Sequence, residues 1–353
     1  MMNTVIKEDL DAIVNEQSID WEQLKDSSVL VTGATGLVGS LVVKALAYYN
    51  KEKCGNIKIL AMVRDMEKAN RVLGHEVVNE GVQFVTGDIR NKTEVSHEVD
   101  YIIHGASITQ SKTMVQYPVE TLFTSVDGTR NMLELARKKE IKSMVYISSM
   151  EAYGITDPSK KKITEKDLGY IDNLSVRSSY PEGKRVCELT CAAYASEYGV
   201  PVKIARLAQT FGAGVPRTEN RVFAQFAKSA MDGTDIILHT KGESFGNYCY
   251  TADVVRGLLC ILTKGENSEA YTLVNEETTM QIKDMAKLVA DTLSKGETKV
   301  VFDIPEDALK FGYAPDVTMH LSGEKARTLG WEPQYNLDKM YERMTKSWLE
   351  EEE

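Results

Sequence analysis

Apolar residues follow two alternating patterns along the first two thirds of the chain. Short apolar runs at 29–31, 57–63, 82–85, 101–103, 144–147 and 202–205 have the length of buried strands. Longer segments at 37–49, 118–139 and 180–198 carry their apolar residues at helical spacing. Strands that alternate with helices pair in parallel through right-handed crossovers. The pattern therefore predicts an α/β fold with a doubly wound parallel sheet.

Both ends of the chain depart from this rhythm. Ile6, Leu10, Ile13 and Val14 lie on one helical face and predict a short helix docked before the first strand. After residue 206 come a glycine-rich loop at 211–216, a helix at 220–231 and a mixture of short elements. We therefore expect an N-terminal helical extension (1–27), a main domain (28–206, with a return segment near 245–262) and a smaller mixed α/β lobe (207–348).

Composition narrows the class of protein. The 353 residues carry a net charge of −10, which disfavours nucleic acid as a partner because phosphate backbones repel an acidic chain. No apolar run approaches the ~18 residues of a membrane span, and we expect no membrane partner. The five cysteines include no C-x-x-C, and the histidines are too scattered for metal spacing, so we expect reduced thiols, no metal and a cytoplasmic location.

A glycine-rich loop follows the first predicted strand. Its glycines are spaced G-x-x-G-x-x-G, where the first two permit a tight turn against a pyrophosphate and the third permits close packing of helix and strand. The helix N-terminus then adds positive potential for the phosphates. This context indicates a Rossmann dinucleotide site, with the cofactor bound by Gly33, Thr35, Gly36, Leu37, Val38 and Gly39.

The end of the second strand bears on the choice of cofactor. An acidic residue there binds the adenosine ribose of NAD, whereas an arginine accommodates the extra phosphate of NADP. Val63 occupies the usual acidic position and Arg64 follows it, which favours NADP over NAD. Asp65 keeps NAD open as the alternative.

Tyr180 and Lys184 begin the helix at 180–198 and, four residues apart, share one face. A free phenol has a pKa near ~10, but a lysine ammonium and a positively charged nicotinamide ring both favour the phenolate. Tyr180 is therefore predicted to exchange a proton with a substrate hydroxyl. Ser148 and Ser149 end the fifth strand, at the edge where such sheets bind ligands, and one of them is expected to bond the same oxygen.

Together these motifs resemble the extended short-chain dehydrogenase/reductases, and among them the nucleotide-sugar epimerases, dehydratases and decarboxylases. The pattern over 175–212 is most similar to UDP-glucuronate decarboxylases. Further matching stretches lie at 87–90, 104–107, 126–129, 147–154, 250–254 and 329–333. The resemblance implies a homodimer formed through the helices at 118–139 and 180–198.

The resemblance also implies roles for single residues. Ser149 would be the catalytic hydroxyl, Tyr180 the acid or base, and Lys184 the residue that binds the nicotinamide ribose. Glu151 falls where related enzymes keep a catalytic glutamate, although a salt bridge to the following loop is an equal alternative. The remaining implied cofactor contacts are Asp88 and Ile89 at the adenine, and Ala106 and Ser107 along the dinucleotide.

Three departures from the family pattern affect the choice of reaction. Met150 replaces the aspartic acid of the dTDP-glucose 4,6-dehydratases, and a thioether cannot donate that proton. Gln209 replaces the asparagine that faces the substrate. Gly246 replaces an arginine that contacts the diphosphate, so we expect Arg217, Arg221 or Lys241 to take over that contact.

Two functions remain open from the sequence. The first is an NAD(P)-dependent nucleotide-sugar epimerase, dehydratase or decarboxylase that acts through transient oxidation at C4. The alternative is an NADPH-dependent reductase of a keto-sugar or related carbonyl, which Arg64 and Gly246 favour. A cofactor-sensing protein without catalysis would not need Ser149, Tyr180 and Lys184 together, and ranks last.

Overall fold

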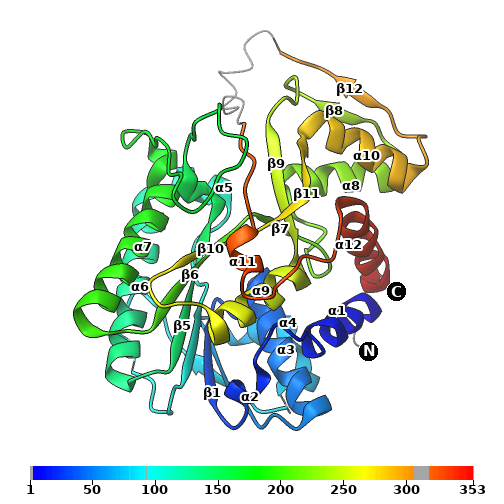
Figure 1. Ribbon diagram of the computed structural model, residues 1–353. Coiled ribbons are helices and arrows are strands. Elements are labelled where there is room, and N and C mark those ends of the chain that lie inside the picture. Colours follow the sequence, from blue (N-terminus) through cyan, green and yellow to red (C-terminus); the bar gives the residue numbers. More distant parts are fainter. Residues whose placement is uncertain (1–2, 79, 93, 306–317, 353) are drawn as a thin grey trace.

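The computed structural model describes residues 3–78, 80–92, 94–305 and 318–352. Its centre is a parallel sheet of seven strands in the order β10-β6-β5-β4-β1-β2-β3 (Figure 1). This confirms the predicted doubly wound α/β fold. The strands are β1 (Ser28–Thr32), β2 (Lys58–Val63), β3 (Val82–Thr86), β4 (Tyr101–His104), β5 (Ser143–Ser149), β6 (Val202–Leu207) and β10 (Ala270–Leu273).

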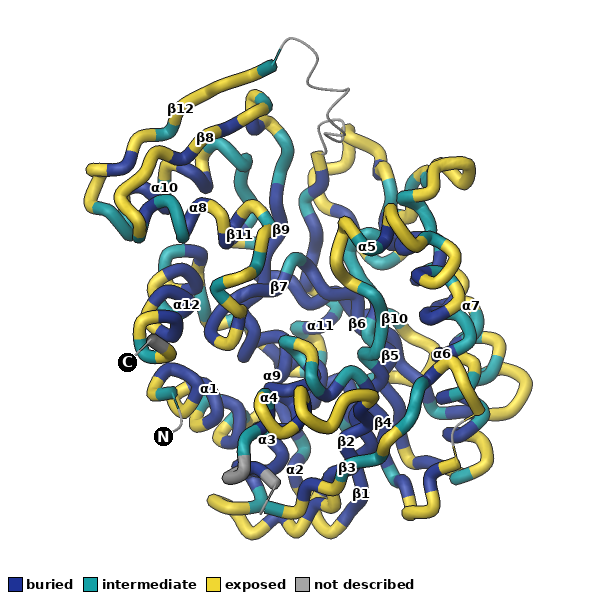
Figure 2. The backbone as a smooth tube through the Cα atoms, turned by 180° about the vertical axis from the view of Figure 1, so that it is seen from behind, coloured by how far each residue is buried: buried dark blue, intermediate teal, exposed yellow. Residues whose placement is uncertain are grey.

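Helices cover both faces of this sheet because alternate side chains of each strand point to opposite sides. In β1, Val29 and Val31 join one apolar core, and Leu30 joins the other. The first core includes α3 (Leu37–Lys53), α4 (Met66–Val78) and α9 (Thr251–Lys264); the second includes α6 (Pro118–Lys139) and α7 (Ser179–Tyr198). Figure 2 shows β1, β4, β5 and β6 buried between these layers, with exposed outer faces on the helices.

Short elements lie between the strands of the sheet and its main helices. They are α5 (Ser111–Gln116) and the two 3₁₀ turns η1 (Met150–Tyr153) and η2 (Val176–Ser178). The seventh strand, β10, was not among the predicted strands. The chain returns to the sheet from the C-terminal half, where α9 packs against β5 and β6 and β10 then pairs with β6.

The C-terminal half builds a smaller group of elements beside the sheet. It contains a three-stranded sheet ordered β11-β9-β7 and a two-stranded parallel sheet of β12 and β8. The strands are β7 (Gln209–Phe211), β8 (Ile236–Leu238), β9 (Phe245–Tyr250), β11 (Asn275–Gln281) and β12 (Val300–Phe302). The helices are α8 (Val222–Met231), α10 (Ile282–Ser294), α11 (Glu324–Arg327) and α12 (Leu337–Glu352).

The N-terminal extension is packed against the rest of the protein. It forms α1 (Thr4–Val14) and α2 (Trp21–Leu24), and α1 contacts α3, α9 and α12. The terminal helices α1 and α12 lie side by side (Figure 1). Arg343 of α12 pairs with the buried Asp9 of α1 at 2.7 Å. The predicted docked helix is therefore confirmed.

Within the described residues no helix is long and apolar enough to cross a membrane. The five cysteines are unbridged thiols, of which Cys54 is exposed and the others are buried. No group of three or more His, Cys, Asp or Glu side chains in the described ranges could hold a metal ion.

Candidate active site

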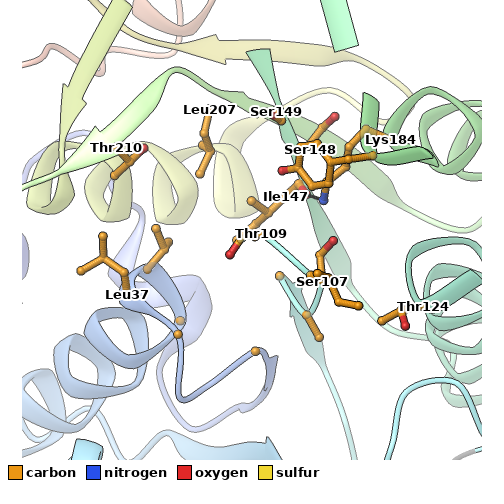
Figure 3. A pocket seen from close by; sticks show the side chains of 18 of the residues that line it. Leu37, Ser107, Thr109, Thr124, Ile147, Ser148, Ser149, Lys184, Leu207 and Thr210 are labelled. Carbon is orange, nitrogen blue, oxygen red and sulfur yellow. Dashed lines mark hydrogen bonds between the residues drawn. The ribbon is translucent and has the colours of Figure 1, made fainter. Parts of the chain in front are cut away.

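A cavity of about 620 Å³ opens at the carboxyl ends of β1, β2, β4, β5 and β6. This is the edge where parallel α/β sheets bind ligands. Figure 3 shows Leu37, beside the glycine loop, across the cavity from Ser148, Ser149 and Lys184. The two motifs predicted from the sequence therefore line one space.

The glycine loop is shaped by close backbone contacts. Gly33 has a φ of 72°, and a Cβ there would lie 2.9 Å from the amide nitrogen of Ala106. A Cβ on Gly39 would lie 2.2 Å from the carbonyl oxygen of Gly33. Gly36 precedes the first turn of α3, which has no side-chain cap. The first amides of α3 are therefore available to phosphate oxygens.

A buried network beneath the loop joins β1 to β4. The Thr32 hydroxyl accepts the amides of Gly105 and Ala106, each at 3.2 Å, and lies 2.7 Å from Nδ1 of His104. Burial, with Lys184 nearby, lowers the pKa of His104 to about 3, so its ring is neutral. His104 therefore accepts from Thr32 and donates through Nε2 to Thr129, at 3.3 Å. His104 is therefore a packing residue.

One end of the cavity carries two cations. Arg64 and Lys68 both line it, and both are exposed. The Asp65 carboxylate instead accepts the amide of Lys68 at 3.0 Å and caps the first turn of α4. Asp65 is absent from the described lining of the cavity. The charge at this end is therefore positive.

Most of the predicted cofactor residues lie on the cavity wall. These are Gly33, Thr35, Gly36, Leu37, Val38, Gly39, Arg64, Ile89, Ala106, Ser107, Tyr180 and Lys184. Asp88 does not belong to the described lining, because its carboxylate pairs with Arg90 at 2.7 Å while its neighbours Gly87 and Ile89 face the cavity. Basic end, phosphate loop and Tyr180 thus follow one another along the cavity, as a dinucleotide requires.

The beginning of α7 supplies the predicted acid–base pair. The Lys184 ammonium donates to the carbonyl oxygen of Ile147 at 2.8 Å and lies 5.7 Å from the centroid of the Tyr180 ring. Burial lowers the pKa of Lys184 to about 8 and, with the negative charge of Glu151, raises the pKa of Tyr180 to about 12. Without a cofactor, Tyr180 is therefore protonated at neutral pH.

The structure distinguishes the two serines that end β5. The Ser148 hydroxyl donates to the buried Glu188 at 2.5 Å, and Glu188 pairs with Arg206 at 2.7 Å. The Ser149 hydroxyl accepts the amide of Glu151 at 3.2 Å and acts to lower the pKa of Tyr180. Of the two serines, Ser149 is therefore the one whose hydroxyl acts on Tyr180.

Glu151 lines the cavity and also forms an ion pair. Nη2 of Arg177 lies 2.8 Å from one Glu151 carboxylate oxygen and 3.0 Å from the other. The salt bridge considered from the sequence is therefore present, with Arg177 as its partner, and the catalytic role of Glu151 stays a prediction. Met150 lines the cavity beside it and offers no proton.

The predicted substrate residues separate into two groups. Gln209 and Arg221 line the cavity, and Arg221 pairs with Glu219 at 2.8 Å. Arg217 lies outside the described lining, and its guanidinium pairs with Asp232 at 2.9 Å. At Gly246 a Cβ would lie 2.2 Å from the Tyr248 hydroxyl oxygen, so a longer side chain there requires Tyr248 to move.

Sequence reasoning missed several wall residues. Lys68 lies four residues after Arg64, and that spacing could have indicated a second cation. The sequence carried no comparable signal for Met114 and Thr124, which reach the cavity from α5 and α6. Arg177 belongs to a recognised motif but had no assigned contact, because Glu151 lies far from it in sequence.

Comparisons with known proteins identify the family. The pattern of the NAD dependent epimerase/dehydratase family matches residues 29–275. UDP-glucuronic acid decarboxylase 6 of Arabidopsis thaliana is 30% identical over 88% of this chain and 85% of its own length. UDP-glucuronic acid decarboxylase 1 of Xenopus tropicalis is 29% identical over 86% of this chain and 68% of its own length.

Solved structures agree in fold. An epimerase from Methanothermobacter thermautotrophicus superposes with a TM-score of 0.78 and 24% identity, over 99% of this chain and 97% of its own. The family match and the sequence relatives confirm the resemblance inferred from the motifs, and this neighbour confirms the fold.

Proposed function

The chain belongs to the NAD dependent epimerase/dehydratase family, and from that premise we propose that it acts on a nucleotide sugar through transient oxidation at C4. One observation carries the proposal: Ser149, Tyr180 and Lys184 converge on the cavity that the glycine loop also lines. Figure 3 shows Ser149 and Lys184 across this cavity from Leu37. A cofactor-sensing protein has no need of that convergence. The bound dinucleotide would supply the acceptor, and later the donor, of a hydride.

Tyr180 would take the proton of the sugar hydroxyl and later return it. Its phenol is buried, and its pKa of about 12 must fall when the positively charged nicotinamide ring binds beside it. Lys184 is anchored on Ile147, so its ammonium stays fixed near the Tyr180 ring. Ser149 would bond the same substrate oxygen and fix its direction toward Tyr180.

The transient ketone would acidify the carbon next to it. Glu151 would exchange a proton with that carbon. The carboxylate is on the cavity wall and suits proton transfer there. Because Met150 cannot protonate a leaving hydroxyl, we propose epimerisation or decarboxylation rather than dehydration. The 28–30% identity to UDP-glucuronic acid decarboxylases supports UDP-glucuronate as the first substrate to test.

We further propose that NADP is preferred over NAD. Arg64 and Lys68 place two positive charges at the end of the cavity where the adenosine would lie, and Asp65 is occupied as the cap of α4. A ribose phosphate would gain charge-assisted hydrogen bonds from this pair. The family name itself specifies only NAD dependence.

The same cations support a second candidate, a reductase that takes NADPH from solution and reduces a keto-sugar. Such an enzyme consumes one NADPH for each product. The C4 mechanism instead returns the cofactor to its starting state after each cycle. Measuring NADPH consumption against product therefore separates the two.

The experiment that tests the main proposal is a panel of sugar nucleotides with the cofactor-loaded protein. UDP-glucuronate, UDP-glucose and dTDP-glucose would be incubated separately, and products would be identified by mass spectrometry and NMR. We expect conversion of one sugar without net change in the cofactor. Stoichiometric cofactor consumption would favour the reductase, and conversion by Tyr180→Phe at the rate of the unmodified protein would contradict the assigned site.

We also propose that the protein is a homodimer. The outer faces of α6 and α7 expose large apolar side chains, namely Val119, Phe123, Val186 and Leu189. Exposed apolar residues gathered on two packed helices are typical of an interface.

The unbridged cysteines fit a reducing compartment, and we propose that the protein is located in the cytoplasm.

A further inference from the structure

Arg177 lies in the middle of η2, three residues before Tyr180. Its Nη2 contacts both oxygens of Glu151, whereas Nη1 is buried without a partner among the described residues. The guanidinium is therefore held in place by Glu151 rather than by a second polar anchor. Both side chains of the pair are partly exposed, so the pair contributes little to folding stability.

Glu151 and Arg177 act on the Tyr180 hydroxyl with opposite signs. The negative charge of Glu151 raises the pKa of Tyr180, and the positive charge of Arg177 lowers it. A carboxylate beside a phenol opposes loss of the phenol proton, because the product would be a second anion. A guanidinium that contacts the carboxylate offsets this effect.

The other groups facing Tyr180 come from several elements. Lys184 lies on α7 itself, Ser149 ends β5, and Arg221 precedes α8; Ser149 and Arg221 also lower the pKa of Tyr180. Thr124 of α6 lines the same cavity and carries no charge. Glu151 is therefore the main anion acting on the phenol, and Arg177 is the cation in direct contact with that anion.

We propose that Arg177 is a positioning residue that neutralises Glu151 and so allows Tyr180 to release its proton while a carboxylate remains in the same cavity. This inference rests on the proposed function, since it assumes that Tyr180 performs the proton transfer. It explains how one site keeps a base for the sugar carbon and a phenol that must also ionise. Without Arg177 the two requirements oppose each other.

The test is a titration of Tyr180 in the protein saturated with NADP⁺. The phenolate absorbance of each protein is compared with that of its Tyr180→Phe derivative, so the difference reports Tyr180 alone. We expect Arg177→Gln to raise the midpoint by about one pH unit and Glu151→Gln to lower it by about as much. The double variant should have a midpoint close to that of the unmodified protein. Arg177→Lys keeps the positive charge, so its midpoint should also stay close to that of the unmodified protein.

A matched control is Arg137→Gln. Arg137 forms a similarly exposed ion pair with Glu134 at 3.0 Å, at the far end of α6. Arg137→Gln should leave the midpoint of the Tyr180 titration unchanged. An unchanged midpoint in both Arg177→Gln and Glu151→Gln would overturn the inference, even if Tyr180→Phe still abolished turnover. Full turnover by Tyr180→Phe would instead overturn the proposed function.

Discussion

The Ser148 hydroxyl donates to Glu188 at 2.5 Å, and this contact assigns different tasks to two adjacent serines. Glu188 and its partner Arg206 are buried, so Ser148 completes an internal ion-pair network. Adjacent residues of a strand point to opposite faces, so Ser149 is free of that network and lies with Tyr180.

Substitution of the two serines should therefore separate activity from stability. Ser149→Ala should lower turnover by about 10²-fold or more, because the substrate oxygen loses a directing hydroxyl, with little change in the melting temperature. Ser148→Ala should cost about 1–3 kcal/mol of stability, because Glu188 loses a buried donor, and should retain turnover. Thermal unfolding and initial rates measure both; the reverse outcome would mean that Ser148 is the catalytic serine.

Cofactor preference should depend on the basic end of the cavity. Arg64→Ala and Lys68→Ala should each weaken NADP binding by about tenfold or more and leave NAD binding nearly unchanged, because NAD lacks the phosphate that these side chains would bind. Isothermal titration calorimetry measures both affinities. Asp65→Asn, which keeps the cap of α4, is the control. Tighter binding of NAD than NADP by the unmodified protein would refute the preference.

Acid sensitivity should follow from the buried ring of His104. Its pKa is about 3 in the folded protein and near ~6.5 in an unfolded chain. As the pH falls through this window, the unfolded chain takes up a proton that the folded protein does not, so stability falls by up to about 1.4 kcal/mol per pH unit. Above pH ~7 this dependence vanishes.

His104→Gln removes that titration. Denaturant unfolding from pH 7.5 to 4.5 should show the variant less stable than the unmodified protein at the upper end, with the gap closing toward the lower end. A gap that stays constant over this range would show that His104 has an ordinary pKa in the folded state.

The oligomeric state should respond to a charge on the outer face of α7. Leu189→Glu should convert a dimer to a monomer in sedimentation, because a carboxylate would be buried in the apolar interface. Leu349→Glu changes a similarly exposed apolar residue on α12 and should leave the dimer intact. If the unmodified protein sediments as a monomer at micromolar concentration, the dimer proposal is wrong.

Local patterns sufficed for much of the fold. The helix at 118–139 was predicted with the bounds that α6 has, because Pro118 starts it and its apolar spacing is regular. β10 was not predicted, because a run of four residues is too short to distinguish a strand from a loop until it pairs with β6. Pairing across such a distance depends on the tertiary fold rather than on the local sequence.

The site shows the same division. Glycine spacing and the Tyr180–Lys184 interval predicted residues that now line the cavity, since each motif lies within one turn or loop. Two other contacts join residues from separate elements, so no local motif predicts them. They are the ion pair of Arg177 with Glu151 and the hydrogen bond from Ser148 to Glu188. Arg217, expected at the substrate, lies outside the described lining and pairs with Asp232, a contact between separate elements that no local pattern indicates.

Isotope tracing tests whether the protein oxidises its sugar transiently at C4 with Tyr180 as the proton carrier. UDP-glucuronate and UDP-glucose carrying deuterium at C4 would each be incubated with the cofactor-loaded protein. We expect product from one of them to retain deuterium at C4 with no net cofactor consumption, and Tyr180→Phe to form this product at least about 10²-fold more slowly. Three results would contradict this mechanism: conversion of neither sugar, loss of the deuterium to the cofactor pool with one cofactor consumed for each product, or full conversion by Tyr180→Phe.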